Sequence, residues 1–344
     1  MVVRHLCAPG DLDIRRPLPG RPAVAQRVTA VAVSEGVARV AVATAAPWFP
    51  GFGELLVFHP GSDRPPARLA AARRIPGAVV RDLLFGPGGT TLTASLGGAD
   101  DQHVGQVAHW SLGGPAERWR RSVSRPVYAG YGEFGGVRLA VSGDGETVAG
   151  CDQSSRSVLA WAADDGHQVA DPAGIGGSEA VAVDADGSRL AFRLCRPYER
   201  APDGAIAVLD RYDGSVTTFP TGVTWCAGLV FAPDGRSLAV IGTTDGTALA
   251  VILGLDGQET TRRALAHLPG EARQQIVRPV WGPAGPLAAV RAGRTVTVWD
   301  LARGRSLLSV PDLGRSTAWA LSPDGRALVV AAPAGVRAYD LDPD

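Results

Sequence analysis

The chain has 344 residues, 45% of them hydrophobic and 20% charged, and its 34 basic and 34 acidic side chains give a formal net charge of zero. This composition supports a large folded core and excludes an intrinsically disordered chain. The absence of a basic excess argues against a general binder of nucleic acids or anionic membranes. We therefore expect a globular protein that binds neither nucleic acid nor membrane.

Targeting and redox features favour a cytoplasmic location. The first residues, MVVRHLCAPGDLDIRR, lack the apolar segment of a signal peptide, and no run of about 18 apolar residues is present. The cysteines form no CxxC pair and no zinc-binding spacing, which leaves reduced thiols as the expectation. All basic residues are arginine, and Ala, Gly, Val and Pro are abundant, as is typical of a GC-rich genome such as that of an actinobacterium.

A unit of two apolar strands joined by a glycine-containing turn recurs along the chain. Its copies read VTAVAVSEGVARVAVAT from Val28, LLFGPGGTTLTAS from Leu83, VRLAVSGDGETVAG from Val137, AVAVDADGSRLAFR from Ala180, LVFAPDGRSLAVIG from Leu229, VRPVWGPAGPLAAV from Val277 and AWALSPDGRALVVAAP from Ala318. In the Pro-Asp-Gly form of the turn, Pro presets φ, Asp bonds the downstream backbone and Gly adopts the positive φ that closes a hairpin.

The spacing of these turns sets the size of the repeat. The turn glycines are Gly36, Gly89, Gly145, Gly187, Gly235, Gly285 and Gly325. Successive glycines lie 40 to 56 residues apart, which suits four short strands per unit with loops of variable length. Seven copies of such a unit predict seven blades.

A third strand follows each pair and frequently ends in an aromatic and an acidic residue. The clearest cases are Trp299-Asp300 in RTVTVWDLARG and Tyr339-Asp340 in GVRAYDLDPD. These dipeptides and the Ser-Pro-Asp-Gly turns resemble those of WD-repeat and YVTN-type bacterial β-propellers over nearly the whole chain. No Gly-His pair opens the repeats, so the side-chain hydrogen-bond network of typical WD repeats is not expected here.

We predict an all-β fold, a single seven-bladed β-propeller of four-stranded antiparallel blades that occupies residues 1–344. The predicted blades are residues 28–72, 79–122, 127–170, 178–220, 224–268, 276–310 and 315–344. Residues 1–27 are expected to form a closing strand and a lead-in. The last unit stops one strand short, and the alternating segment Asp11–Arg15 is expected to supply that outer strand, which would leave no open edge.

Function on such a scaffold is expected in the loops, and the longest loops fall on blades one to four of the face opposite the Pro-Asp-Gly turns. Large aromatic side chains gather in the second-to-third-strand loop of blade one and at the entry to blade three. Such residues anchor interfaces, although they also plug the ends of small sheets. The predicted binding residues in these loops are Trp48, Phe49, Phe52, Tyr128, Tyr131 and Glu133.

Charged residues mark two further loops on the same face. The blade-four loop, residues 193–204, could hold an anion through arginine forks, or form a solvated loop with weak internal ion pairs. The blade-two loop, residues 97–105, joins two carboxylates to an imidazole, which suits a divalent cation, acid–base chemistry or simply a solvated turn. The predicted binding residues in these loops are Asp100, Asp101, His103, Arg196, Tyr198 and Arg200.

Residues at the starts of the innermost strands are expected to line the central channel. These residues are Arg81, Asp82, Glu179, Trp225, Arg278 and Trp319. Charges at such positions either pair across the channel around water or contact a ligand. Trp225, Arg278 and Trp319 are included among the predicted binding residues.

These features favour a monomeric binding or scaffold module for a protein or small-molecule partner, with no cofactor, no metal site and no catalytic residue. The alternative is a propeller enzyme, such as a lactonase-like hydrolase, acting at the channel mouth through Asp101, His103, Glu133 and Arg200. A sensor or accessory subunit is a third interpretation that the sequence does not separate from the first. The sialidase Asp box and the quinoprotein tryptophan-docking repeat are both missing from the sequence.

Overall fold

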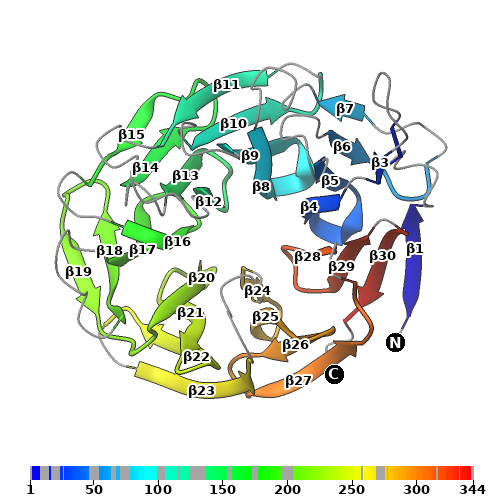
Figure 1. Ribbon diagram of the computed structural model, residues 1–344. Helices are drawn as coiled ribbons and strands as arrows, with labels where there is room; N and C mark the ends of the chain where they lie inside the picture. Colours follow the sequence, from blue (N-terminus) through cyan, green and yellow to red (C-terminus); the bar gives the residue numbers. More distant parts are fainter. Residues whose placement is uncertain are drawn as a thin grey trace.

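The ring architecture follows directly from the repeats. The computed structural model describes residues 2–7, 15–16, 24–25, 27–45, 54–62, 67–69, 78–98, 105–114, 117–123, 137–152, 157–172, 177–194, 204–256, 259–268, 276, 278–314, 317–332 and 334–341. Seven four-stranded antiparallel sheets stand as blades around a central opening (Figure 1). The predicted all-β seven-bladed propeller is therefore confirmed.

The blades follow the chain in order around the ring, and in blades 1 to 6 the strands run from the innermost to the outermost. Blade 1 contains β4 (Arg27–Val33), β5 (Val40–Ala45), β6 (Leu55–Phe58) and β7 (Ala67–Leu69). Blade 2 contains β8 (Ala78–Phe85), β9 (Thr91–Gly98), β10 (Gln106–Ser111) and β11 (Glu117–Ser122). Blade 3 contains β12 (Val137–Val141), β13 (Thr147–Asp152), β14 (Ser157–Ala162) and β15 (Gln168–Ala170).

The second half of the ring repeats this plan. Blade 4 contains β16 (Gly177–Val183), β17 (Arg189–Leu194), β18 (Ile206–Asp210) and β19 (Val216–Phe219). Blade 5 contains β20 (Trp225–Phe231), β21 (Ser237–Thr244), β22 (Thr247–Gly254) and β23 (Glu259–His267). Blade 6 contains β24 (Val280–Gly282), β25 (Gly285–Ala292), β26 (Thr295–Asp300) and β27 (Arg305–Val310). Blade 7 contains β28 (Ala318–Leu321), β29 (Ala327–Ala332), β30 (Gly335–Asp340) and β1 (Val3–Cys7).

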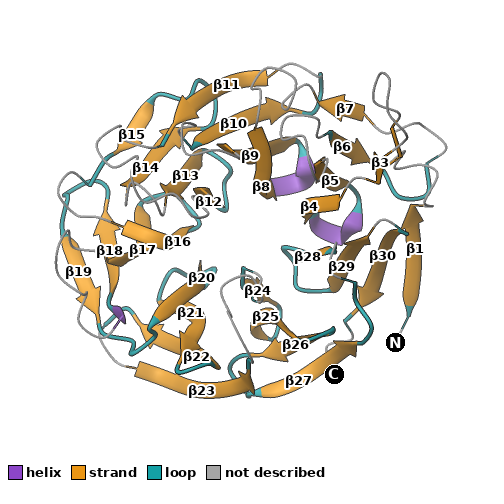
Figure 2. Cartoon of the chain, in the orientation of Figure 1, coloured by secondary structure: helices purple, strands orange, loops and turns teal. Residues whose placement is uncertain are grey.

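Helix is a minor component of the described residues. The 3-10 turns η1 (Glu35–Val37) and η3 (Pro87–Gly89) sit between the first and second strands of blades 1 and 2 (Figure 2). Within the part of the chain that the structure describes, no helix is long and apolar enough to cross a lipid bilayer.

The ring is closed by an N-terminal strand, as predicted, but by a different segment. β1 pairs antiparallel with β30 and completes blade 7 (Figure 1), whereas the prediction chose Asp11–Arg15. Arg15–Arg16 (β2) pairs instead with Val24–Ala25 (β3). The prediction relied on apolar alternation, which an outermost strand does not need. The described side chains of β1 are exposed apart from Leu6, which packs against the apolar cluster between blades 7 and 1.

The turns between first and second strands, here called the turn face, join neighbouring blades. Each predicted turn glycine has a positive φ, from 61° at Gly36 to 128° at Gly285, which L side chains rarely adopt. Hydrogen bonds between the turns of adjacent blades run from Gly36 N–H to Asp324 Oδ2 (2.9 Å), Arg39 Nη1 to Gly89 O (2.6 Å), Asp144 N–H to Ala185 O (2.8 Å) and Arg189 Nη2 to Gly235 O (2.9 Å). The turn sequences thus form the blades and also connect them.

The core lies between blades. Each apolar cluster among the described residues fills the interface of two neighbouring blades, so the clusters continue around the ring. Near the axis, where blades converge, the clusters use alanines such as Ala30 and Ala182. Farther out they use Trp110, Trp119 and Trp161, which are at most 5% exposed. The change from small to large side chains fits the widening wedge between blades.

Candidate functional site

The face opposite the turns, here called the loop face, is built unequally. In blades 5, 6 and 7 the second and third strands are joined by Asp245–Gly246, Gly293–Arg294 and residues 333–334. Asp245 and Gly246 both have positive φ, 49° and 73°, as in the tight hairpin turn that matches strand twist. In blades 1, 2 and 4 the corresponding connections are residues 46–54, 99–105 and 195–205. The long connections therefore fall on one side of the ring.

Most sequence-predicted binding residues belong to these long connections or to the entry to blade 3. They lie outside the described residues, and their roles stay predictions. They are Trp48, Phe49, Phe52, Asp100, Asp101, His103, Tyr128, Tyr131, Glu133, Arg196, Tyr198 and Arg200.

The described part of the site is the loop-face end of the central channel, here called the channel mouth. Several innermost strands carry a β-bulge there, centred on Thr29 in β4, Arg81 in β8, Glu179 in β16 and Ala227 in β20. A bulge redirects a side chain that regular pairing would place in an inter-blade interface. Glu179 has φ 77°, an uncommon conformation for a residue with a side chain, so the fold holds this carboxylate in place despite backbone strain.

An ion pair spans the channel mouth. The Arg278 guanidinium donates to Asp82 Oδ2, which also accepts the Leu139 N–H at 3.1 Å. Asp82 lies on β8 of blade 2 and Arg278 lies two residues before β24 of blade 6, and these strands stand on opposite sides of the opening (Figure 1). Gly228 of blade 5 lets the lead-in to blade 6 approach, because a Cβ there would lie 2.4 Å from Pro279 Cδ. One carboxylate thus holds blades 2 and 3 and this lead-in together.

The Glu179 carboxylate connects blades 4 and 5 in a similar way. Glu179 Oε2 accepts a hydrogen bond from Arg193 Nη1 at 2.6 Å and from the Cys226 N–H at 2.9 Å. Arg193 Nε, by contrast, is buried without a hydrogen-bond partner. Burial and the nearby Glu179 raise the pKa of the Cys226 thiol to about 12, so this thiol stays protonated and unreactive.

Among the described residues of the channel mouth, arginines outnumber carboxylates. Besides Arg278 and Arg193, Arg81 and Arg138 lie at the starts of inner strands, and among the described residues no carboxylate pairs with either. Burial, followed by the charge of Arg27, lowers the pKa of Arg81. Burial also lowers the pKa of Arg278, with Asp82 opposing that shift and Arg138 adding to it. Arg138 is therefore within electrostatic range of Arg278, and Arg81 within range of Arg27, and burial partly withdraws Arg81 and Arg278 from water.

The two predicted tryptophans pack mainly between blades. Trp225 is buried in the cluster between blades 5 and 6, and Trp319 is half-buried against the cluster between blades 6 and 7. The Arg291 guanidinium lies 5.4 Å from the Trp319 ring centroid, within cation–π distance. Trp319 Nε1 is buried and has no hydrogen-bond partner. Their contact with a ligand remains a prediction.

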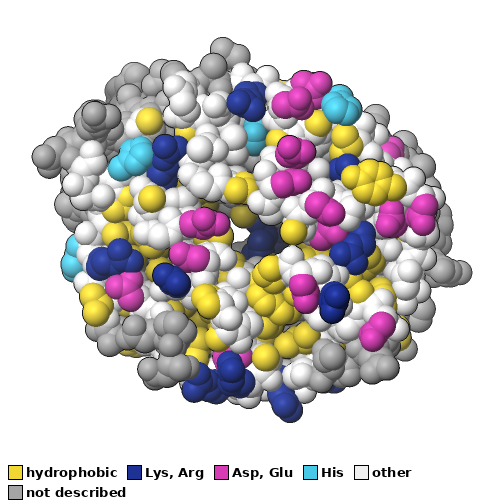
Figure 3. Space-filling view, turned by 180° about the vertical axis from the view of Figure 1, so that it is seen from behind, with side chains coloured by type: hydrophobic (Ala, Val, Ile, Leu, Met, Phe, Trp, Pro, Cys, Tyr) yellow, Lys and Arg dark blue, Asp and Glu magenta, His cyan; other side chains and the backbone are white. Residues whose placement is uncertain are grey.

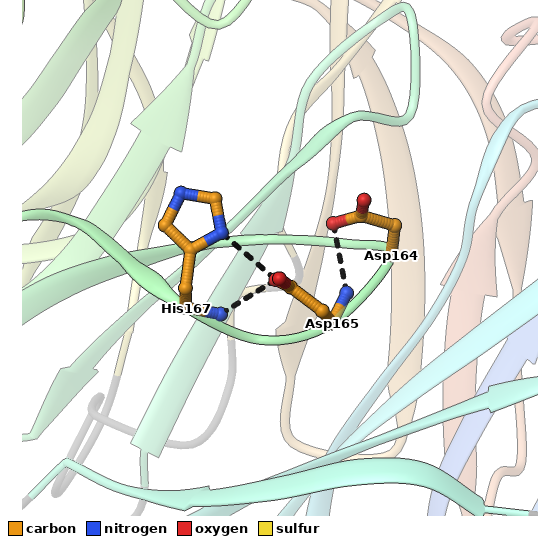
Figure 4. Close-up of side chains that lie close together, drawn as sticks. All are labelled: Asp164, Asp165 and His167. Atoms are coloured by element: carbon orange, nitrogen blue, oxygen red, sulfur yellow. Dashed lines mark hydrogen bonds and ion pairs between the residues drawn. The ribbon is translucent and has the colours of Figure 1, made fainter.

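Sequence analysis did not single out an acidic turn on blade 3. Asp164, Asp165 and His167 bring their side chains together in the turn before β15 (Figure 4). Asp165 Oδ1 accepts from the His167 backbone N–H and lies 2.8 Å from His167 Nδ1, while Asp164 Oδ1 accepts the Asp165 N–H at 2.8 Å. The three side chains are exposed, and these turn-internal bonds account for their arrangement. The Asp-Asp-x-His spacing shared with residues 100–103 was the available sequence signal.

The buried histidine of blade 2 is structural. His109 Nδ1 lies 2.8 Å from Thr93 Oγ1, and its ring stacks on Trp119 with centroids 5.2 Å apart. Burial, with a smaller contribution from Arg118, lowers the pKa of His109 to about 4. Both Thr93 and His109 are fully buried, so this hydroxyl–imidazole pair does not reach a substrate.

Comparison with known proteins supports the fold and leaves the family open. No protein-family model matches the sequence, and no curated protein matches it. A chain in a crystal structure of the mitotic checkpoint complex has the same fold, with a TM-score of 0.64 and 16% sequence identity. The match covers 100% of this chain and 91% of that one. At this identity the likeness concerns the fold alone.

Proposed function

We propose that this protein is a binding module resembling WD-repeat and YVTN-type propellers, which holds a protein or small-molecule partner on the loop face of blades 1–4. The observation that carries the proposal is the difference in connection length. Two-residue turns suffice for blades 5 to 7, so the longer connections of blades 1, 2 and 4 are not needed to build a blade. Long loops on a rigid scaffold are the common location of recognition residues.

The chemistry of the described residues agrees better with binding than with catalysis. The Thr93–His109 pair is sealed in blade 2, and the Cys151 and Cys226 thiols are buried with raised pKa values, chiefly because of burial. The hydrolase alternative thus gains no support from this part of the chain. A cytoplasmic location and a monomeric state belong to the same proposal.

A loop replacement tests the proposal. Residues 45–53 would be exchanged for Asp-Gly, the dipeptide of the blade 5 turn, because the Thr44 N–H already bonds Glu54 O at 2.9 Å across the base of this loop, as Thr244 and Thr247 flank Asp-Gly in blade 5. The matched control changes the turn face instead, through Asp164→Asn and Asp165→Asn. Partners would be captured from a lysate of the source organism with each bait and compared by mass spectrometry.

We expect the wild-type protein and the turn-face control to capture the same partner, and the loop replacement to lose it. Circular dichroism should show the same strand content in all three proteins. Equal capture by the loop replacement and loss by the turn-face control would contradict the proposal. Turnover of a small molecule without any captured partner would favour the enzyme alternative.

A further inference from the structure

We propose that the channel mouth is a binding site for a doubly charged oxyanion, of which inorganic phosphate is the simplest example, formed by Arg81, Arg138, Arg193 and Arg278. This inference goes beyond the proposed function, because it places a ligand inside the ring and does not require the long loops.

The position of the arginines is set by the backbone around Asp82. Arg81 precedes Asp82 on the bulge of β8, and Arg138 precedes Leu139, whose N–H donates to Asp82. Arg278 reaches the same carboxylate from the opposite side of the channel. Three guanidinium-bearing residues from blades 2, 3 and 6 are therefore anchored around one carboxylate, by contacts that fix their backbone positions.

The charges of the described channel-mouth residues do not balance. Asp82 pairs with Arg278 and Glu179 pairs with Arg193, which leaves Arg81 and Arg138 without a carboxylate among the described residues. Within the described part of the channel mouth, two positive charges thus lack an acidic partner, and such charges in a confined channel favour an anion that carries two negative charges. A guanidinium offers a planar fork of donors that matches the oxygens of phosphate or sulfate.

Unused hydrogen-bond donors support the same conclusion. Arg193 Nε is buried with no acceptor, although another nitrogen of the same guanidinium bonds Glu179. An unpaired buried N–H is costly, and most such groups in folded proteins find a partner. An oxyanion supplies acceptors and no donors, so it satisfies such atoms without creating new unpaired ones.

Mutual repulsion makes the site unfavourable while no anion is bound. Burial and Arg27, which lies outside the proposed site, lower the pKa of Arg81. Burial and Arg138 lower the pKa of Arg278 against the pull of Asp82, so Arg138 and Arg278 repel each other. A dianion between these groups would relieve that repulsion and stabilise the fold by linkage. The prediction is therefore a change in stability as well as a binding signal.

The position of the arginines favours entry from the loop face, because they lie toward the loop-face end of the inner strands. Seen from the turn face, acidic side chains and arginines both lie around the opening, and an arginine is visible inside it (Figure 3).

The test is a titration of the full-length protein with sodium phosphate at constant ionic strength, followed by calorimetry and by thermal unfolding. The variants are Arg81→Gln and Arg138→Gln, and the control is Arg236→Gln, which removes an exposed arginine from the turn face. We expect saturable binding and a saturable rise in Tm for the wild type and the control. Each mouth variant should bind phosphate about tenfold more weakly.

The mouth variants should also keep or raise their Tm without phosphate, because each removes a cation that has no described carboxylate partner. If Arg81→Gln does not fold, Arg81→Lys keeps the charge without the fork and should bind phosphate at an intermediate level. A non-saturating rise in Tm that is equal in all variants would be a general salt effect and would overturn the proposal. So would a wild type that shows no phosphate binding.

A second titration, with phosphoserine, distinguishes a site for free phosphate from a site for a phosphate group on a larger molecule. Phosphoserine that binds as tightly as inorganic phosphate would show that the mouth accepts a phosphate on a larger molecule. Binding of inorganic phosphate alone would show that the site takes the free ion, and both results support the site. Because free phosphate binding does not involve residues 45–53, the loop replacement should retain it, so the two proposals can fail separately.

Discussion

The two ends of the same strands are held in different ways. On the turn face, the turns of blades 3 and 7 repeat one set of bonds: the Ser142 and Ser322 hydroxyls donate at 2.5 Å to Asp144 and Asp324, and each aspartate accepts the N–H two residues on. At the channel mouth, the contacts are individual side-chain pairs such as Arg278 with Asp82. The recurring turn-face bonds hold the ring together. The individual contacts at the channel mouth leave some cations and hydrogen-bond donors available for binding.

Selection for the fold would therefore act mainly on the turn face, and selection for function mainly on the channel mouth. Turn-face groups are paired with each other or with the next blade, so changing them should alter stability. Channel-mouth groups include cations and donors that the ring does not use, so changing them should alter ligand binding.

The largest effect is expected from removing the closing strand. Deleting residues 1–20 removes β1, whose four register pairs with β30 close blade 7. At about 1 kcal/mol for each ladder hydrogen bond, the loss of stability should be about 3–5 kcal/mol. Urea unfolding followed by tryptophan fluorescence would measure it, and an unchanged Tm would contradict the role of β1.

Arg4→Ala is the matched control for this deletion. It removes the exposed ion pair between Arg4 and Asp340 and leaves the strand in place. Because such surface pairs contribute little, the change should cost no more than about 1 kcal/mol. A loss as large as that of the deletion would mean that the ion pair, and not the strand, closes the ring.

The middle of blade 2 should respond to pH. The pKa of His109 is about 4 in the fold, below the ordinary value of 6.5, so the unfolded chain binds the proton more readily. The stability that the fold gains by keeping His109 neutral is fully present above pH 6.5. It is lost as the pH falls toward 4, by about 3 kcal/mol in total. Between pH 6.5 and pH 4, the unfolding free energy of His109→Gln should therefore decrease by about 3 kcal/mol less than that of the wild type. Identical pH profiles for both proteins would contradict a buried neutral imidazole.

The cross-channel pair should contribute less than the closing strand. Arg278→Ala leaves the half-buried Asp82 without its cation, and Asp82→Ala does the converse. Each should cost about 2–3 kcal/mol, below the value for a fully buried pair because both side chains keep some exposure. A double-mutant cycle by urea unfolding should show that the double variant loses less than the sum. Strict additivity would mean that the two residues do not interact.

The smallest effect separates two equivalent turn aspartates. Asp324 accepts hydrogen bonds from Ser322 Oγ and from the Gly36 N–H of blade 1, whereas Asp234 accepts the Arg236 N–H within its own turn. Asp324→Ala should therefore cost about 1–2 kcal/mol and Asp234→Ala about half as much. Equal losses in urea unfolding would indicate that the blade 7 to blade 1 bond adds nothing.

The sequence predicted the ring well because the ring depends on local signals. Each turn glycine marks a backbone position that needs positive φ, and Trp299-Asp300 and Tyr339-Asp340 end third strands β26 and β30 as expected. The closing strand was assigned to the wrong segment, because an exposed outer strand needs little apolar alternation. Backbone hydrogen bonds with β30 determine which segment forms the closing strand, and such bonds do not require particular side chains.

The channel mouth was predictable only in part, because its contacts are not local. The start positions of inner strands correctly drew attention to Asp82 and Arg278, but their pairing joins residues 196 positions apart. The bulge that redirects Glu179 depends on a register shift against β17 and has no local sequence signal. Arg138 and Arg193 were missed because, in a chain whose only basic residue is arginine, neither stands out.

Hydrogen–deuterium exchange of the protein with its captured partner would test the central claim most directly, since it reports which end of the strands the partner covers. If the partner binds the loop face, we expect slower exchange in residues 46–53 and 195–203 and at the channel mouth around Asp82 and Leu139. Exchange in the turns at residues 142–146 and 184–188 should remain unchanged. Slower exchange confined to those turns would contradict the assignment of binding to the loop face.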